Sequence, residues 1–149
     1  MAIDREKIIR GVKLILEGVG EDLTREGLER TPERIAEFYE EVLAGMEQDP
    51  AVELRKYTTK NKDEMIILRD ISFFSLCEHH LLPFFGHIHI AYIPQNDKMV
   101  GFSNMIKVID ILTKRLQVQE RLTSQIADSI VDALGAKGVL VVIEAEHLC

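Results

Sequence analysis

Cysteine is scarce in this sequence, tryptophan is absent, and no long apolar run occurs. Two cysteines, Cys77 and Cys149, are too few for a disulfide framework, but they are enough for one disulfide or for two thiolate ligands to a metal. No apolar stretch approaches the roughly 18 residues of a membrane span, and residues 1–10 carry charges of both signs instead of a signal-peptide core. We therefore expect a soluble, cytoplasmic chain without a membrane partner.

Basic residues are outnumbered, with 18 Lys and Arg against 25 Asp and Glu, for a formal net charge of −7. Nucleic acids and anionic membranes repel a net anion, so neither is expected as a partner. A polyanionic substrate must instead meet a local cluster of basic side chains.

Repeats, low-complexity tracts and long linkers are also missing from the sequence. A chain of 149 residues that is 46% apolar can close one core of good size. We expect a single domain over residues 1–149, with N-terminal helices over about 1–48 and a sheet with further helices over about 60–149.

The spacing of apolar residues predicts four helices and several strands. Helices are expected at 4–17, from Thr31 (as N-cap) to about Met46, at 103–116 and at 120–134, where Gly135 stops the last one. Strands are expected at 64–76, 86–93, 99–101 (after a turn at Asn96-Asp97) and 139–143. This order indicates an α+β domain with helices on one sheet face. Its short sheet leaves open edges, which favours oligomerisation.

A candidate metal site lies just after an expected strand, in Cys77-Glu78-His79-His80. A thiolate and an imidazole three residues apart can bind one metal ion, although a buried Cys beside a turn His explains an isolated C-x-x-H equally well. Side chains alternate along a strand, so His147 and Cys149 share a face near the C-terminal strand and could reach the same ion.

Cys77, His80 and Cys149 would then bind Zn²⁺ with a fourth position open, which is typical of a catalytic zinc site. His79 and His147 would be free for proton transfer. A water on zinc can have a pKa of about 7. The pattern points to metal-assisted hydrolysis.

Two other pairs are weaker candidates. His87 and His89 share a strand face and could form a second metal site, but strand histidines are more often solvated or satisfied in a core, and the sequence shows no carboxylate or thiolate beside them. Glu144 and Glu146 also share a face, and a solvated sheet edge explains them more simply than an acid/base pair.

Three sequence blocks resemble the signature blocks of the GTP cyclohydrolase I family. They are Cys77-Glu78-His79-His80, Gln117-Val118-Gln119-Glu120-Arg121-Leu122-Thr123 and His147-Leu148-Cys149. Arg30-Thr31-Pro32-Glu33-Arg34 and Gly101-Phe102-Ser103 extend the resemblance over nearly the whole chain.

The resemblance implies a tunnelling fold, in which antiparallel sheets with helices on one face join across subunits into a barrel. The usual assembly is a decamer of two pentamers, with active sites between subunits. It also implies conversion of GTP to 7,8-dihydroneopterin triphosphate and formate, with the metal supplying the attacking water.

The same resemblance assigns site residues. Cys77, His80 and Cys149 correspond to zinc ligands, and His79 and His147 to catalytic histidines. The remaining assignments are Glu120 and Gln119 at the guanine edge, Ser103 near the ribose, and Arg34 and Lys107 at the triphosphate.

Two departures from the family pattern bear on activity. Where the family has Ser-Lys-x-x-Arg, this chain has Ser103-Asn104-Met105-Ile106-Lys107, which removes one cation and replaces a guanidinium with an ammonium. The family also continues beyond the position of Cys149, so we expect a shortened chain whose last ligand is loosely held.

These departures leave open a second interpretation, a zinc-binding oligomer of the same fold that acts by binding a partner. A third, a redox thiol pair in an unrelated fold, does not explain residues 117–123.

Overall fold

The structure of the chain is a computed structural model that describes residues 3–58, 64–95 and 98–149. In chain order the elements are α1 (Arg5–Gly18), α2 (Thr31–Val42), the 3-10 helices η1 (Ala44–Glu47) and η2 (Pro50–Glu53), β1 (Lys56–Thr58), β2 (Ile66–Cys77), β3 (Pro83–Ile93), β4 (Lys98–Val100), α3 (Phe102–Thr113), β5 (Leu116–Gln117), α4 (Gln119–Leu134) and β6 (Gly138–His147).

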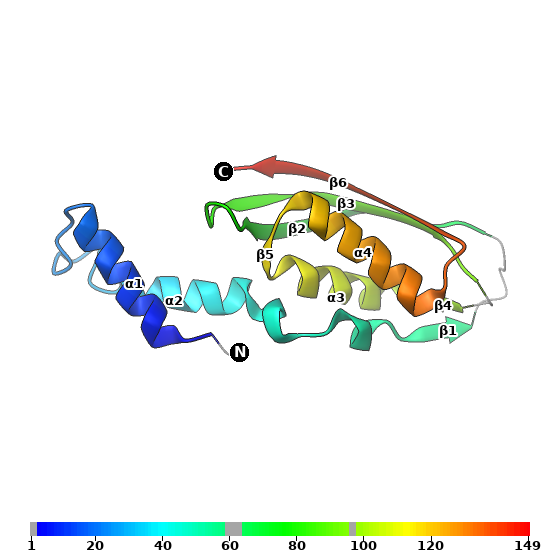
Figure 1. Cartoon of the computed structure of the whole chain (residues 1–149), viewed down its shortest axis with the longest axis horizontal. Helices are drawn as coiled ribbons and strands as arrows, with labels where there is room; N and C mark the ends of the chain where they lie inside the picture. Colours follow the sequence, from blue (N-terminus) through cyan, green and yellow to red (C-terminus); the bar gives the residue numbers. More distant parts are fainter. Residues whose placement is uncertain (1–2, 59–63, 96–97) are drawn as a thin grey trace.

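The main sheet has the strand order β5-β2-β3-β6. The three long strands are antiparallel to their neighbours, whereas the short β5 pairs with β2 in parallel. Helices α3 and α4 lie against one face of this sheet, and α1 and α2 extend past its end (Figure 1). This arrangement confirms the expected α+β architecture with helices on one sheet face.

The core lies between the sheet and the two covering helices. Alternate residues of β3, among them Phe84 and Ile88, are fully buried against α4 residues such as Leu122 and Ile126. The other face of the sheet is open and partly apolar, and Ile67 of β2 and Leu140 of β6 are 56% and 61% exposed. The alternation of strand side chains thus leaves one apolar face without a partner in the described chain.

Two element boundaries near the site differ from the sequence expectation. The helix expected to continue to residue 116 ends at Thr113, because Leu116 and Gln117 pair with Leu76 and Cys77 as β5. The last strand, expected at 139–143, continues to His147 because residues 144–147 pair with β3. In both cases pairing with a distant strand overrides the local pattern.

The N-terminal region differs in smaller ways. Thr31 lies inside the first turn of α2 rather than at its N-cap, which is Arg30 and has no capping side chain. The helix ends at Val42, and Met46 belongs to η1. The short β1, which pairs with β4, was not expected. The predicted turn at Asn96-Asp97 lies outside the described residues.

Among the described residues, no helix combines the length and apolar character needed to cross a membrane.

Candidate functional site

Four segments meet at one end of the sheet: the end of β2, the turn into β3, the end of β6 and the segment that starts α4 (Figure 1). Strand register brings them together, because Cys77 pairs with Gln117 and Phe84 pairs with His147. The C-terminus of the chain therefore lies beside the Cys77–His80 turn.

Three side chains at this end of the sheet lie close enough together to bind one metal ion: Cys77, His80 and Cys149. One donor atom from each lies within 4.8 Å of the others, and both cysteines are free thiols. Tetrahedral zinc with bonds of about 2.0–2.3 Å requires ligand atoms roughly 3.5 Å apart, so the three donors need only a small contraction. Two thiols and an imidazole also match the ligand preference of Zn²⁺. Because His80 and Cys149 are exposed, a fourth ligand has access to the ion.

The Cys149 thiol interacts with the buried Cys77 side chain. Its hydrogen bond with the Cys77 side chain is the main reason why the pKa of Cys149 is raised above its ordinary value.

His147 is held in a defined orientation. Its ring stacks on Phe84 with centroids 4.9 Å apart and planes 7° apart. The Gln119 amide donates from Nε2 to the Ile143 carbonyl at 2.8 Å, so its Oε1 faces His147 Nε2, also at 2.8 Å. His147 Nε2 must then carry the proton, and Nδ1 is left as an acceptor facing Cys149 Sγ at 3.6 Å.

His79 lies in the same turn as the candidate ligand His80. The two ring centroids are 6.4 Å apart and the planes are nearly perpendicular, at 87°. Both side chains are exposed. A second exposed histidine therefore lies beside the cysteine-histidine group, in addition to His147.

The remaining predicted site residues are distributed differently. Glu120 is exposed in the first turn of α4, directly beside Gln119. Arg34 on α2 and Ser103 at the start of α3 are exposed, and the described contacts join neither to the cysteine-histidine group. Lys107 forms an ion pair with Glu53 at 3.2 Å. Asn104 is buried and donates a 2.7 Å hydrogen bond to the Glu53 carbonyl.

The expectation that His87 and His89 have no carboxylate beside them is wrong for His89, which lies on the open sheet face. A carboxylate does lie beside His89, because Glu144 Oε2 is 3.4 Å from its Nε2, while Nδ1 accepts a hydrogen bond from the Asp70 amide. Even so, the described residues contain a single group of three potential ligands close enough to share an ion, and it is Cys77, His80 and Cys149. Glu146 is exposed, as expected for a solvated edge.

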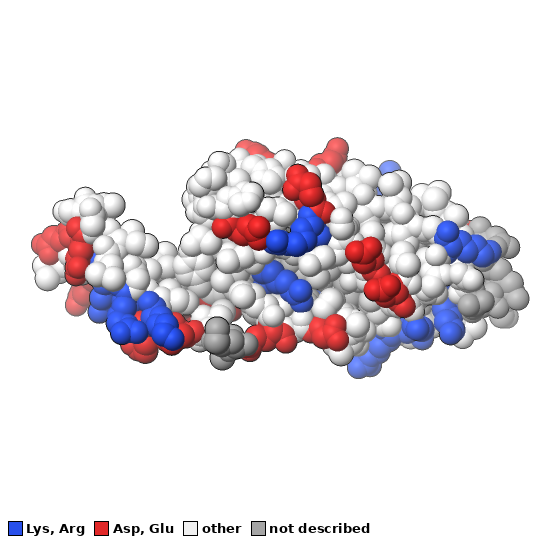
Figure 2. Space-filling view, viewed as in Figure 1, with Lys and Arg blue, Asp and Glu red and all other residues white. Residues whose placement is uncertain are grey.

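Sequence reasoning missed two residues that support the site, Phe84 beneath His147 and Arg121 beside Glu78. Arg121 lies within the recognised 117–123 block, so its position could have drawn attention to it. For Phe84, the only signal is its place directly after the Cys77–Pro83 segment. On the face drawn in Figure 2, acidic and basic side chains lie close together in small groups, including over the start of α4.

Comparison with known proteins agrees with this geometry. The family model described as GTP cyclohydrolase I matches residues 8–149. GTP cyclohydrolase 1 of Carboxydothermus hydrogenoformans is 54% identical over 147 residues, covering 99% of this chain and 77% of that protein. GTP cyclohydrolase 1 of Pelotomaculum thermopropionicum is 52% identical, over 98% of this chain and 78% of that protein. The chain belongs to the GTP cyclohydrolase I family.

Proposed function

We propose that this chain hydrolyses and rearranges GTP to 7,8-dihydroneopterin triphosphate and formate. The observation that carries the proposal is the convergence of Cys77, His80 and Cys149 with His79 and His147 at one end of the sheet, in a chain of this family. Zinc held by the two thiolates and the imidazole would supply a water of lowered pKa for attack on the purine ring.

The chain's own side chains hold the substrate and move protons. His79 and His147 flank the group, and one of them donates a proton to N7 of the purine as the imidazole ring opens. The Glu120 carboxylate accepts two N–H donors from the guanine edge, which aligns the base relative to the histidines. Arg34 and Lys107 contact the triphosphate, and Ser103 acts near the ribose during the later rearrangement.

The geometry supports an active site shared between subunits. Helix α3 starts at Phe102 and ends at Thr113, near β5 and the cysteine-histidine group. Ser103 is ten residues from that end, or about 15 Å along the helix axis. One chain therefore does not bring Ser103 to its own metal group, but a neighbouring copy can. We propose that the single domain assembles as a decamer of two pentamers whose sheets join into a barrel.

The test is incubation of zinc-loaded protein with GTP while formate and pterin absorbance are followed. Formate and pterin should both appear, and both should disappear with a chelator or in the His79→Ala variant. His87→Ala, which alters a histidine of the open sheet face, should retain turnover. Absence of both products from zinc-loaded wild-type protein would contradict the proposal.

A second candidate function has specific support. Asn104 is buried and Lys107 is paired with Glu53, so the first turns of α3 offer a triphosphate little free positive charge. This favours a zinc-binding oligomer that acts through a protein partner. Tight zinc binding without formate or pterin would support that alternative.

A further inference from the structure

The Cys77–His80 turn needs an external support if its histidines are to keep their positions. Its base is closed by two backbone bonds of 2.8 Å, from Cys77 N–H to the Leu82 carbonyl and from Leu81 N–H to the Cys77 carbonyl. Beyond this base, Glu78, His79 and His80 are exposed side chains on a tight turn. These two bonds fix the backbone conformation of the turn, but they do not fix its orientation relative to α4.

Two contacts on Glu78 supply that support. Its backbone N–H donates to the Gln117 carbonyl at 3.0 Å, and its carboxylate forms an ion pair with the Arg121 guanidinium. Glu78 lies between the candidate ligand Cys77 and His79, so any movement of Glu78 moves both.

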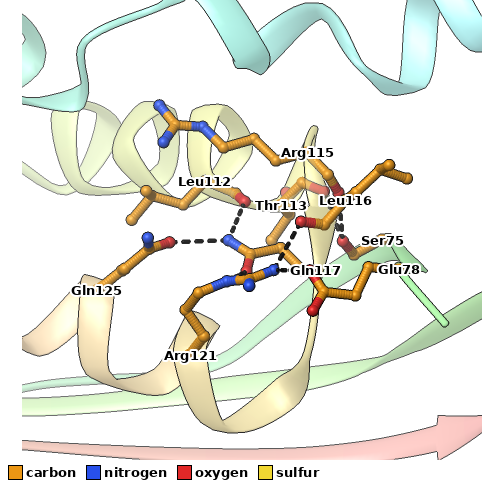
Figure 3. Close-up of polar contacts among 9 residues, drawn as sticks. All are labelled: Ser75, Glu78, Leu112, Thr113, Arg115, Leu116, Gln117, Arg121 and Gln125. Atoms are coloured by element: carbon orange, nitrogen blue, oxygen red, sulfur yellow. Dashed lines mark hydrogen bonds and ion pairs between the residues drawn. The ribbon is translucent and has the colours of Figure 1, made fainter.

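Arg121 is itself fixed by a buried amide (Figure 3). Its Nε donates to Gln117 Oε1 at 3.0 Å, and the nitrogen that binds Glu78 also donates to the Leu116 carbonyl at 2.9 Å. Gln117 is 1% exposed, and its Nε2 donates to the Leu112 carbonyl and to Gln125 Oε1, both at 2.9 Å. All polar atoms of this amide are satisfied, so Arg121 presents its guanidinium to Glu78 in one geometry.

We propose that Arg121 is a positioning residue that acts through Glu78 to hold the Cys77–His80 turn against the start of α4. The inference rests on the proposed function, because it assigns the turn its role in metal binding and proton transfer. Gln119, two residues before Arg121, fixes His147. The positions of both candidate catalytic histidines therefore depend on contacts with one short segment, Gln117–Arg121.

A purely stabilising role fits the pair less well. The side chains of Arg121 and Glu78 are 40% and 36% exposed, and exposed ion pairs add little to stability because water and salt screen them. The pair forms a geometric constraint between two segments that carry the chemistry. Its loss should therefore change the site more than it changes the melting temperature.

The test uses full-length Glu78→Ala, Glu78→Gln and Arg121→Ala, together with the Glu78→Ala/Arg121→Ala double variant. Zinc affinity is measured by competition with a chromogenic chelator, and kcat and KM for GTP are measured on zinc-saturated protein. Hydrogen exchange of residues 77–82 in metal-free protein gives a readout that needs neither metal nor turnover.

Glu78→Ala should weaken zinc binding on the order of tenfold, lower kcat more than it raises KM, and speed exchange of the turn amides. Glu78→Gln keeps an acceptor for Arg121 and should restore most of the affinity. The double variant should lose no more zinc affinity than Arg121→Ala alone, since both act through one contact.

Arg115→Ala is the matched control. This arginine donates to the carbonyls of Gly45 and Gln48, at 3.0 and 2.6 Å, and so ties η1 to the segment before β5. Its loss should lower the melting temperature but leave zinc affinity unchanged.

Unchanged zinc affinity and turn exchange in Glu78→Ala would overturn the inference, as would additive losses in the double variant. If the wild-type protein binds zinc and turns over GTP, and Glu78→Ala has the same zinc affinity and turnover, this inference alone is refuted. Wild-type protein that binds no zinc would refute the proposed function as well.

Discussion

At the scale of single residues, Gln119 links the sheet to His147. Its amide is anchored on the Ile143 carbonyl and faces the imidazole at 2.8 Å, while Phe84 supports the ring from below. These two contacts set both the tautomer and the direction of the ring. A histidine that must exchange a proton at one atom depends on such constraints.

We therefore predict that Gln119→Ala lowers kcat on the order of tenfold to a hundredfold, because His147 is free to rotate and to change tautomer. KM for GTP should change less if the main role of the side chain is to orient His147. Steady-state kinetics on zinc-saturated protein gives both values. Gln48→Ala, which alters an exposed glutamine whose side chain donates to the Ala44 carbonyl, is the control and should match wild type. A rise in KM with unchanged kcat would show instead that the amide mainly binds substrate.

The chemical groups of the candidate site were easier to predict from the sequence than the residues that hold those groups in place. Few residue types bind zinc, so Cys77, His80 and Cys149 could be proposed as a group from spacing alone, and the structure brings them together. Phe84 and Arg121 belong to residue types with many ordinary uses. Their roles depend on which residues lie across a strand pair or beside a turn, and local sequence does not specify that.

At the scale of elements, the pairing of β3 with β6 positions the C-terminal part of the site. Gly86 pairs with Ala145, and a Cβ at Gly86 would lie 2.0 Å from the Glu144 carbonyl oxygen. The two strands can approach this closely only because residue 86 has no side chain. His147 and Cys149 follow directly after this contact.

Gly86→Ala should therefore destabilise the fold by about 1–3 kcal/mol, the usual cost of overpacking, because backbone atoms must move. It should also weaken zinc binding, since the displaced end of β6 carries Cys149 toward solvent. Thermal unfolding and chelator competition measure the two effects.

Two glycine variants separate the effects. Gly138→Ala lies in the same strand β6, where a Cβ meets no atom within 4 Å, and should change neither quantity. Gly45→Ala places a Cβ 2.0 Å from the Ile111 carbonyl oxygen, away from β6, and should reduce stability without a specific loss of zinc affinity. Equal stability of Gly86→Ala and wild type would show that the strands can separate at little cost.

The element boundaries show where local patterns stop being sufficient. Apolar spacing predicted the four α-helices of the described residues, because each has one apolar face on the core or on a neighbouring helix. It could not predict β5, whose two residues leave the helical pattern to pair with Leu76 and Cys77. That pairing joins the Cys77–His80 turn to the segment before α4, so the least predictable element is one that shapes the candidate site.

At the scale of the whole molecule, two features of the described residues favour contact with another chain: an unpaired sheet edge and an exposed apolar sheet face. The ten-residue strand β6 lies at the edge of the sheet, with β3 on one side and no strand on the other within the described residues. Long unpaired edges invite pairing with another chain. The open sheet face adds exposed apolar side chains of β2 and β6, including Ile67, Leu140 and Val142. Pairing of sheets between copies would satisfy both features.

Such an assembly also places the two halves of the proposed active site on different subunits. His79 and His147 lie at the end of the sheet that carries Cys77, His80 and Cys149, near the end of α3. Ser103 lies about 15 Å along the helix axis from that end of α3. Two inactive variants should then complement each other. Co-expressed His79→Ala and Ser103→Ala subunits should recover pterin formation at about a quarter of the sites, since random mixing leaves that share with both wild-type halves.

The matched control is co-expression of His79→Ala with His147→Ala. Both changes affect the half of the site that carries the histidines. Every subunit then lacks either His79 or His147, so no arrangement gives a complete site and pterin formation should stay absent. Differently tagged subunits purified in tandem ensure that mixed oligomers are assayed. If the His79→Ala and Ser103→Ala mixture stays inactive although mixed oligomers form, Ser103 does not complete a neighbour's site. The proposed division of the active site between subunits would then be wrong, even if each wild-type oligomer turns over GTP.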